Sequence, residues 1–407
     1  MEGNEDAPSF LGQVVEDAQA AVAKAAPAGA GERRVPFVFS GSGSEFFKIW
    51  IVNVLLSIVT LGIYSAWAKV RTLRYFYGNT SLDGNTFEYL AEPIKILKGR
   101  LIVFAVFLVY FVAHFFFPLI GLPFGLLILL LMPWVIRQSL RFRYHYTVWR
   151  GVRFAFAGGL WDAAKAFILW PFVPFVGAAI IAGLAAFGVT IISSTALKVL
   201  TSVLAFLLLL LYLLSTMHIP WHRQTHYLTD NSRFGAVSFE NHSTPRDFFK
   251  VFVVLLGILF GFMLVMTAIG VILVFAMVAM GKSQPPGILI NVLSMVAYLI
   301  IISILSTWYK VRMTNLRLGQ TNIGPHRLVS SYATESYLTL FITNTLATIF
   351  TLGLFYPFAK VRTARYAAEH TAIMIRGDLD GFVAEREAEV SALGSAVSDF
   401  LDIDIGF

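Results

Sequence analysis

The sequence predicts an all-α polytopic membrane protein, built from internally repeated helical hairpins with short cytoplasmic β-hairpin-like inserts. Of its 407 residues, 57% are hydrophobic and 14% are charged, whereas soluble domains carry about a quarter charged residues. The apolar residues form long continuous blocks, and about 20 apolar residues suffice for a helix to span a bilayer. Six blocks lack Asp, Glu, Lys and Arg altogether, at 49–68, 101–136, 166–197, 251–281, 283–309 and 336–359. A motif that recurs along the chain is the third observation.

The apolar blocks divide the chain into three parts. Residues 1–34 are rich in alanine and lack the apolar core of a signal peptide, so we expect a disordered N-terminal tail. Residues 35–377 form the membrane domain, and residues 378–407 form an acidic C-terminal tail. The end of that tail, 400–407, alternates apolar and acidic residues as an edge strand or a docking peptide would. The membrane domain has a first segment at 46–75, helical hairpins at 101–136, 164–217 and 249–309, and a last segment at 337–366.

The first and last segments are copies of one motif. Thr60-Leu-Gly-Ile-Tyr-Ser-Ala-Trp-Ala-Lys-Val-Arg-Thr-Leu-Arg-Tyr75 aligns without gaps on Thr351-Leu-Gly-Leu-Phe-Tyr-Pro-Phe-Ala-Lys-Val-Arg-Thr-Ala-Arg-Tyr366. Weaker copies around Trp134, Trp221 and Trp308 close the three hairpins. The chain therefore has five apolar units, each ending in an aromatic residue followed by basic residues. A short polar stretch of turn and strand character follows, such as the one containing Asp83-Gly84, a hairpin-turn signal.

These motifs resemble the YjgN family of bacterial inner-membrane proteins, which share a domain of unknown function. The resemblance rests on Phe39-Ser-Gly-Ser-Gly-Ser-Glu-Phe-Phe47, on the motif that begins at Thr60, and on Gly78-Asn-Thr80 with Asp83-Gly84. It extends from about residue 36 to the C-terminus. It implies a multi-pass protein of the bacterial inner membrane, and it implies no activity.

Two topologies remain open. Most Lys and Arg residues lie in the stretches that follow the apolar units, and the hairpin tips hold only Lys198 and Lys282. If the first and last segments each cross the membrane once, the positive-inside rule is only half obeyed. If both are re-entrant and turn near Thr60-Leu61-Gly62 and Thr351-Leu352-Gly353, every other Lys and Arg is cytoplasmic. Plain spans are far commoner than re-entrant segments, which favours the first topology.

Matched polar residues inside the two terminal segments are candidates for lining a translocation path. These are Asn53, Thr60, Gly62, Asn344, Thr351 and Gly353. An amide in hydrocarbon needs a partner, so the alternative role for Asn53 and Asn344 is hydrogen bonding between helices. No acidic residue lies in any apolar block, which disfavours ion-coupled pumping through intramembrane carboxylates.

Basic residues at the spacing i, i+2, i+5 are candidates for binding anionic lipid head groups, because guanidinium forks suit phosphate oxygens. They are Lys69, Arg71, Arg74, Lys360, Arg362 and Arg365, and the last two arginines of each set are expected to share one helix face. The alternative is positive-inside anchoring beside an aromatic belt of Trp67, Trp134, Trp221 and Trp308.

No enzyme, metal or cofactor signature is present in the sequence. His218, His222 and His226 could form a stripe, but Pro220 interrupts it and no neighbouring carboxylate is evident. Three functions stay open: a transporter or channel, a lipid-handling protein, and a membrane scaffold whose cytoplasmic repeats and acidic tail recruit partner proteins. We favour the first two. The expected partners are membrane lipids, anionic ones among them, with a homo-oligomer and a cytoplasmic protein as further options and no nucleic acid.

Overall fold

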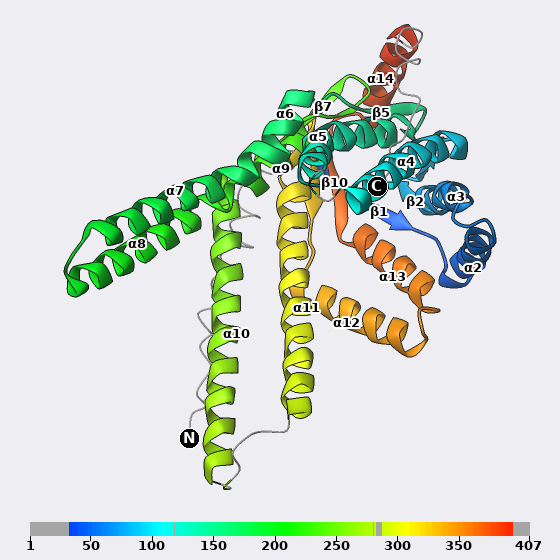
Figure 1. The fold of residues 1–407 in the computed structure, drawn as a ribbon. Coiled ribbons are helices and arrows are strands. Elements are labelled where there is room, and N and C mark those ends of the chain that lie inside the picture. The colour runs from blue at the N-terminus through cyan, green and yellow to red at the C-terminus, as the bar shows by residue number, and fades with distance from the viewer. Residues whose placement is uncertain (1–31, 118, 120, 280, 282–286, 394–407) are drawn as a thin grey trace, which may run out of the picture.

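A closed ten-strand antiparallel barrel forms the centre of the molecule, and five helical hairpins project from one of its ends (Figure 1). This computed structural model describes residues 32–117, 119, 121–279, 281 and 287–393. The predicted all-α fold is therefore wrong: the short β-hairpin-like inserts are not isolated, and they assemble with two further strands into one barrel. Residues 1–31 of the predicted N-terminal tail lie outside the described residues, and residues 32–34 belong to the first strand.

The chain repeats the order strand, helical hairpin, strand five times. Unit 1 contains β1(Glu32–Phe39), α2(Gly43–Val59), α3(Ser65–Gly78) and β2(Thr80–Leu82). Unit 2 contains β3(Asn85–Tyr89), α4(Pro93–Phe116), α5(Gly121–His145) and β4(Thr147–Trp149). Unit 3 contains β5(Val152–Phe156), α6(Leu160–Ala164), the π-helical turn η2(Lys165–Leu169), α7(Trp170–Ile191), α8(Thr195–Thr216), α9(Ile219–Asp230) and β6(Ser232–Phe234). Unit 4 contains β7(Val237–Asn241), α10(Pro245–Ala279), α11(Gly287–Gly319) and β8(Thr321–Ile323). Unit 5 contains β9(His326–Ser330), α12(Thr334–Phe350), α13(Tyr356–Glu369) and β10(Thr371–Arg376).

The two ends of the chain close the barrel. β1 pairs with β10, with Val35 opposite Ile373, and it also pairs with β2, with Val38 opposite Ser81. Tight turns join successive units at the end of the barrel away from the helices, which we call the turn end. At Asp83-Gly84 and Arg150-Gly151 both residues have positive φ, as type I′ hairpin turns require. The hairpin predicted at Asp83-Gly84 is thereby confirmed.

Aromatic side chains fill the barrel interior. Trp149 lies 6.0 Å from Phe87 and 5.8 Å from Phe234, measured between ring centroids, and Phe154 lies 5.1 Å from Phe234. Val35, Leu82, Val152, Leu328, Ile373 and Ile375 complete this cluster and are all buried. The interior of the barrel is therefore a packed hydrophobic core.

The sequence did not predict the barrel, because no single strand is long enough to indicate one. Four of the ten strands have only three residues. An isolated two-stranded hairpin is marginal in water, and these hairpins gain a core only when all five units contribute. The alternation Val152, Phe154, Phe156 on β5 is the signal that was available, because alternate residues of a strand face one side of a sheet.

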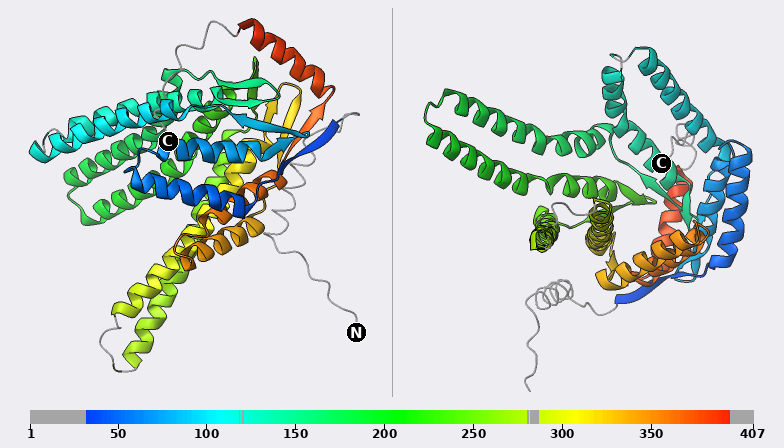
Figure 2. Two further views of the ribbon diagram at one scale, coloured as in Figure 1. Left: turned by 90° about the vertical axis from the view of Figure 1, so that its right-hand side faces the viewer. Right: turned by 60° about the horizontal axis from the view of Figure 1, so that its bottom comes forward.

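Six helices in the described part of the chain are long and apolar enough to cross a membrane, two from each of units 2, 3 and 4. At most 17% of the most apolar 18-residue window of any of them is buried within the molecule. Exposed apolar surface on that scale needs lipid or protein to cover it. The hairpins diverge in different directions as they leave the barrel (Figure 2).

The helix α14(Leu379–Leu393) covers the turn end of the barrel, opposite the hairpins (Figure 1). Leu379 and Val383 are buried in the barrel cluster, and Phe382 packs against it. Asp380 forms an ion pair with Arg150 at 2.6 Å. The acidic tail predicted at 378–407 thus begins as a docked helix. Residues 394–407, which include the predicted edge strand or docking peptide, lie outside the described residues.

The buried side chain of His326 contacts α14 and predicts that the docking of this helix depends on pH. Its ring is 1% exposed and contacts Phe382 edge-on with ring centroids 4.6 Å apart, and Nδ1 accepts a hydrogen bond from the Arg376 N–H at 3.3 Å. Burial lowers the pKa of His326 below its ordinary value of 6.5. The imidazole ring is therefore protonated less readily in the folded chain than in the unfolded one.

We therefore expect α14 to be fully docked above pH 6.5 and to loosen as the pH falls below it. Limited proteolysis of α14 between pH 8 and 5 measures this, and His326→Gln is expected to flatten the profile. An unchanged pH profile in that variant would exclude His326 as the responsible group. Full protection of α14 at pH 5 in the wild type would contradict the expectation as well.

Candidate functional site

The two terminal segments are short helical hairpins whose turns lie at the Thr-Leu-Gly positions. Thr60 Oγ1 donates to the Leu56 carbonyl at 2.7 Å and accepts from the Tyr64 N–H at 2.9 Å. Thr351 repeats both bonds, with the Ala347 carbonyl and the Phe355 N–H, at the same distances. These side chains, predicted as path-lining, build the turns.

The glycine in each turn is required by the backbone. Gly62 and Gly353 have φ of 90° and 93°, a region that only glycine adopts without strain. This explains why both copies keep glycine there. Because α2 and α3 are separate antiparallel helices, as are α12 and α13, neither terminal segment is one continuous span. The chain turns back at the positions that the re-entrant topology requires.

The tips of both hairpins expose large apolar side chains. Leu61 and Leu352 are each 94% exposed. Other exposed side chains at the tips are Ile58, Val59, Ile63, Ile349, Phe350 and Leu354. Apolar tips of this kind are typical of segments that enter a bilayer.

An asparagine–arginine pair links the two helices of each terminal hairpin. Arg71 Nη1 donates to Asn53 Oδ1 at 3.5 Å and to the Tyr64 hydroxyl at 3.0 Å. Arg362 Nη1 donates to Asn344 Oδ1 at 2.7 Å, and its Nη2 donates to Thr343 at 3.2 Å. The structure thus brings together residues assigned separately from the sequence, because the asparagines were predicted to line a path and the arginines to bind lipid.

An open groove of about 560 Å³ lies between α2, α3 and α13. Asn53, Lys69 and Lys360 line it, and all three are candidates from the sequence. Phe46, Trp50, Val54 and Ile58 supply an apolar wall, and Ser57, Ser65 and Thr72 add hydroxyl groups. Those hydroxyl residues were missed in the sequence, although Thr72 lies inside the repeated Ala-Lys-Val-Arg-Thr string. The groove combines cationic, polar and apolar surface, as an amphiphilic ligand requires.

The second arginine of each predicted pair, Arg74 or Arg365, contacts the neighbouring unit and not its own hairpin. The two arginines of a pair therefore bind different partners. Arg74 Nη2 donates to the Ala91 carbonyl at 3.0 Å, where β3 leads into α4. Arg365 Nη2 donates to the Gly41 carbonyl at 3.2 Å, where β1 leads into α2. Each guanidinium group thereby fastens one unit to the strand–helix junction of the next.

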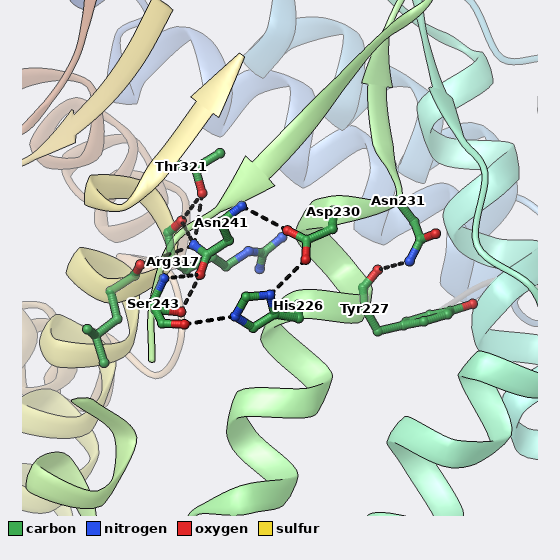
Figure 3. A network of polar contacts seen from close by, with 9 residues as sticks. His226, Tyr227, Asp230, Asn231, Asn241, Ser243, Arg317 and Thr321 are labelled. Atoms are coloured by element: carbon green, nitrogen blue, oxygen red, sulfur yellow. Dashed lines mark hydrogen bonds and ion pairs between the residues drawn. The ribbon is translucent and has the colours of Figure 1, made fainter. Parts of the chain in front are cut away.

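Every unit makes an equivalent joint to its successor. Arg137 Nε donates to the Gly158 carbonyl at 2.9 Å, and Asn315 Nδ2 donates to the Tyr332 carbonyl at 2.9 Å. In unit 3 the donor is His226 Nε2, which bonds to the Ser243 carbonyl at 3.0 Å (Figure 3). With Arg74 and Arg365, these bonds form a ring of five joints that Arg365 closes.

The joint after unit 3 extends into a polar network. His226 Nδ1 lies 2.7 Å from Asp230 Oδ2, and Asp230 Oδ1 accepts from the Asn241 N–H at 2.8 Å (Figure 3). Asn241 Nδ2 donates to Thr321 Oγ1 and to the Arg317 carbonyl, both at 3.0 Å. Asp230 is a carboxylate partner that the sequence analysis missed. Within the described residues, no group of three or more His, Asp and Glu residues is suited to a metal ion.

The four tryptophans of the predicted aromatic belt have different environments. Trp134 is 42% exposed on α5. Trp67 stacks on Tyr64, and Trp221 contacts Phe252 and Tyr309 edge-on. Trp308 lies under the Arg312 guanidinium group. The belt itself stays a prediction.

Residues 34–400 match the family model described as "Bacterial protein of unknown function (DUF898)". The chain belongs to this family. It is 27% identical over 365 residues to the inner membrane protein YjgN of Salmonella typhimurium (strain LT2), covering 84% of this chain and 89% of the relative. It is also 38% identical over 126 residues to the inner membrane protein YjgN of Escherichia coli (strain K12).

The chain spans 30% of the length of that Escherichia coli relative in the match. No solved structure matches the chain. The family and the six membrane-capable helices together confirm the predicted family and a multi-pass location in the inner membrane.

Proposed function

We propose that the protein handles lipid in one leaflet of the inner membrane. In this proposal the two terminal hairpins enter the bilayer without crossing it, and a lipid occupies the groove between α2, α3 and α13. The observation that carries the proposal is the position of this groove. It combines Asn53 and two lysines with an apolar wall, and its lining extends to Ile58, three residues before the exposed tip residue Leu61.

The depth of the groove supports this proposal. Asn53 lies six residues before the end of α2 at Val59, which is about 9 Å along a helix at 1.5 Å per residue. An inserted tip would therefore place Asn53 and the lysines near the boundary between head groups and acyl chains, because interfacial elements bury about 5–10 Å.

An aqueous channel receives less support from the same residues. The barrel interior is packed with aromatic rings. In α12 the hydroxyls of Thr339, Thr343 and Thr348 each donate to the carbonyl four residues earlier, so these groups are already bonded within the helix. The scaffold alternative rests on the cytoplasmic repeats and the acidic tail, and it receives less support because the first helix of that tail packs on its own barrel.

Lipid contact at the tips provides the first test. Leu61→Cys and Leu352→Cys would be labelled with a fluorophore in reconstituted vesicles, since the native chain has no cysteine. We expect brominated lipids to quench both probes strongly and to leave a probe at Thr86→Cys, exposed on β3, unquenched.

Retained lipid provides the second part of that test. Purified protein in detergent is expected to keep phospholipid, detected by phosphate analysis and mass spectrometry, and Leu61→Gln with Leu352→Gln is expected to reduce the amount. Unquenched probes at both tips together with lipid-free protein would refute the proposed function.

A further inference from the structure

Repeat symmetry is broken at one side chain in the groove. In unit 5 the Asn344 amide is satisfied, since Nδ2 donates to the Ala359 carbonyl at 3.4 Å and to Thr363 Oγ1 at 3.5 Å. In unit 1 the equivalent residues, Ala68 and Thr72, line the groove instead. Asn53 is only 4% exposed, yet its Nδ2 has no hydrogen-bond partner.

An unsatisfied buried amide N–H costs free energy comparable to a lost hydrogen bond. Such a donor is therefore typical of a site that an acceptor group completes. Oδ1 of Asn53 already accepts from Arg71, so Nδ2 is the atom of this amide that is left to bond a ligand oxygen in the groove.

Two equivalent lysines complete the chemistry of this site. Lys69 and Lys360 occupy the same position in the two copies of the motif, and both reach the one groove because α13 packs beside α2. Phe47 contacts Phe358 and Trp50 contacts Tyr356 across that interface, with ring centroids 5.8 and 6.1 Å apart. Lys360 Nζ lies 5.2 Å above the Tyr356 ring. Two ammonium groups and an amide donor attract an oxyanion.

We infer that this groove is a binding site for the phosphate group of an anionic phospholipid, held by Asn53, Lys69 and Lys360. The inference rests on the proposed function and adds selectivity for head-group charge. The ligand is a lipid rather than free phosphate because the remaining wall is apolar, with Trp50, Val54 and Ile58 available to an acyl chain.

The test is a lipid titration of the full-length protein in detergent, read by native mass spectrometry. Phosphatidylglycerol is expected to bind more tightly than phosphatidylcholine. Lys69→Gln and Lys360→Gln are each expected to weaken phosphatidylglycerol binding on the order of fivefold. This factor corresponds to the contribution of about 1 kcal/mol that one basic residue makes near a membrane surface. Lys48→Gln is the matched control, because Lys48 is exposed on α2 and lies outside the groove.

Asn53→Ala and Asn344→Ala form a second matched pair. Both lose the bond to an arginine within their own hairpin, but only Asn53 has an amide donor without a partner. We expect Asn53→Ala to weaken phosphatidylglycerol binding and Asn344→Ala to leave it unchanged. If both variants lower affinity equally, the effect is structural and the assignment of Asn53 fails.

The remaining outcomes separate the inference from the proposed function. Lipid retention without preference between the two head groups would overturn the inference and leave lipid handling in place. Displacement of bound phosphatidylglycerol by millimolar inorganic phosphate would identify free phosphate as the ligand and overturn the lipid assignment. Failure to retain any phospholipid would overturn the inference, and combined with unquenched probes at both tips it would overturn the proposed function as well.

Discussion

Trp149→Ala is expected to destabilise the protein by about 3–5 kcal/mol, the range for truncating a large buried aromatic residue. The Trp149 side chain is 5% exposed, packs between Phe87 and Phe234, and donates from Nε1 to the Asn85 carbonyl at 3.1 Å. Its removal leaves a cavity in the barrel and removes this hydrogen bond. The thermal midpoint in detergent, followed by size-exclusion chromatography of heated samples, measures the loss.

Trp134→Ala is the matched control for that experiment. Trp134 is 42% exposed on α5, so its truncation creates no comparable cavity and the midpoint is expected to change little. Equal melting of the Trp149 variant and the wild type would show that the barrel interior does not stabilise the fold.

Arg365→Ala is expected to destabilise the protein by about 1.5–3 kcal/mol, the range for a hydrogen bond that involves a charged group. Arg365 closes the ring of five joints by donating to the carbonyl of Gly41, which is buried. Arg74→Ala, at the equivalent position of unit 1, is expected to have a similar effect because its two acceptors are also backbone carbonyls.

Arg34→Ala controls for the loss of a positive charge, since Arg34 is exposed on β1. Melting in detergent is again the measurement, and Arg365→Lys is expected to recover only part of the loss because an ammonium group lacks the planar fork. If Arg365→Ala melts no earlier than Arg34→Ala, the ring of joints contributes nothing to stability.

The ring gives the internal repeat a physical meaning. Each unit has only two short strands and a helical hairpin, and a single unit cannot bury a hydrophobic core without its neighbours. Closure through β1–β10 pairing and through Arg365 joins residues more than 300 positions apart. The repeated Lys-Val-Arg-Thr-x-Arg string therefore serves two tasks, since its first arginine braces its own hairpin and its last arginine holds the next unit.

The sequence alone predicted the membrane location and the repeat of one motif, and it offered the turns at Thr60-Leu61-Gly62 and Thr351-Leu352-Gly353 only as part of the less favoured topology. The first two features rest on local signals: continuous apolar blocks and a motif copied without gaps. Only the tertiary structure decided the rest. Strands of three residues carry too little pattern to predict a barrel, because their stability comes from partners far along the chain. The docking of α14 depends on the turn end of the barrel, which several segments far apart in the sequence form together. The difference between Asn53 and Asn344 likewise arises from packing, since identical residues in copied motifs meet different neighbours once α13 lies against α2.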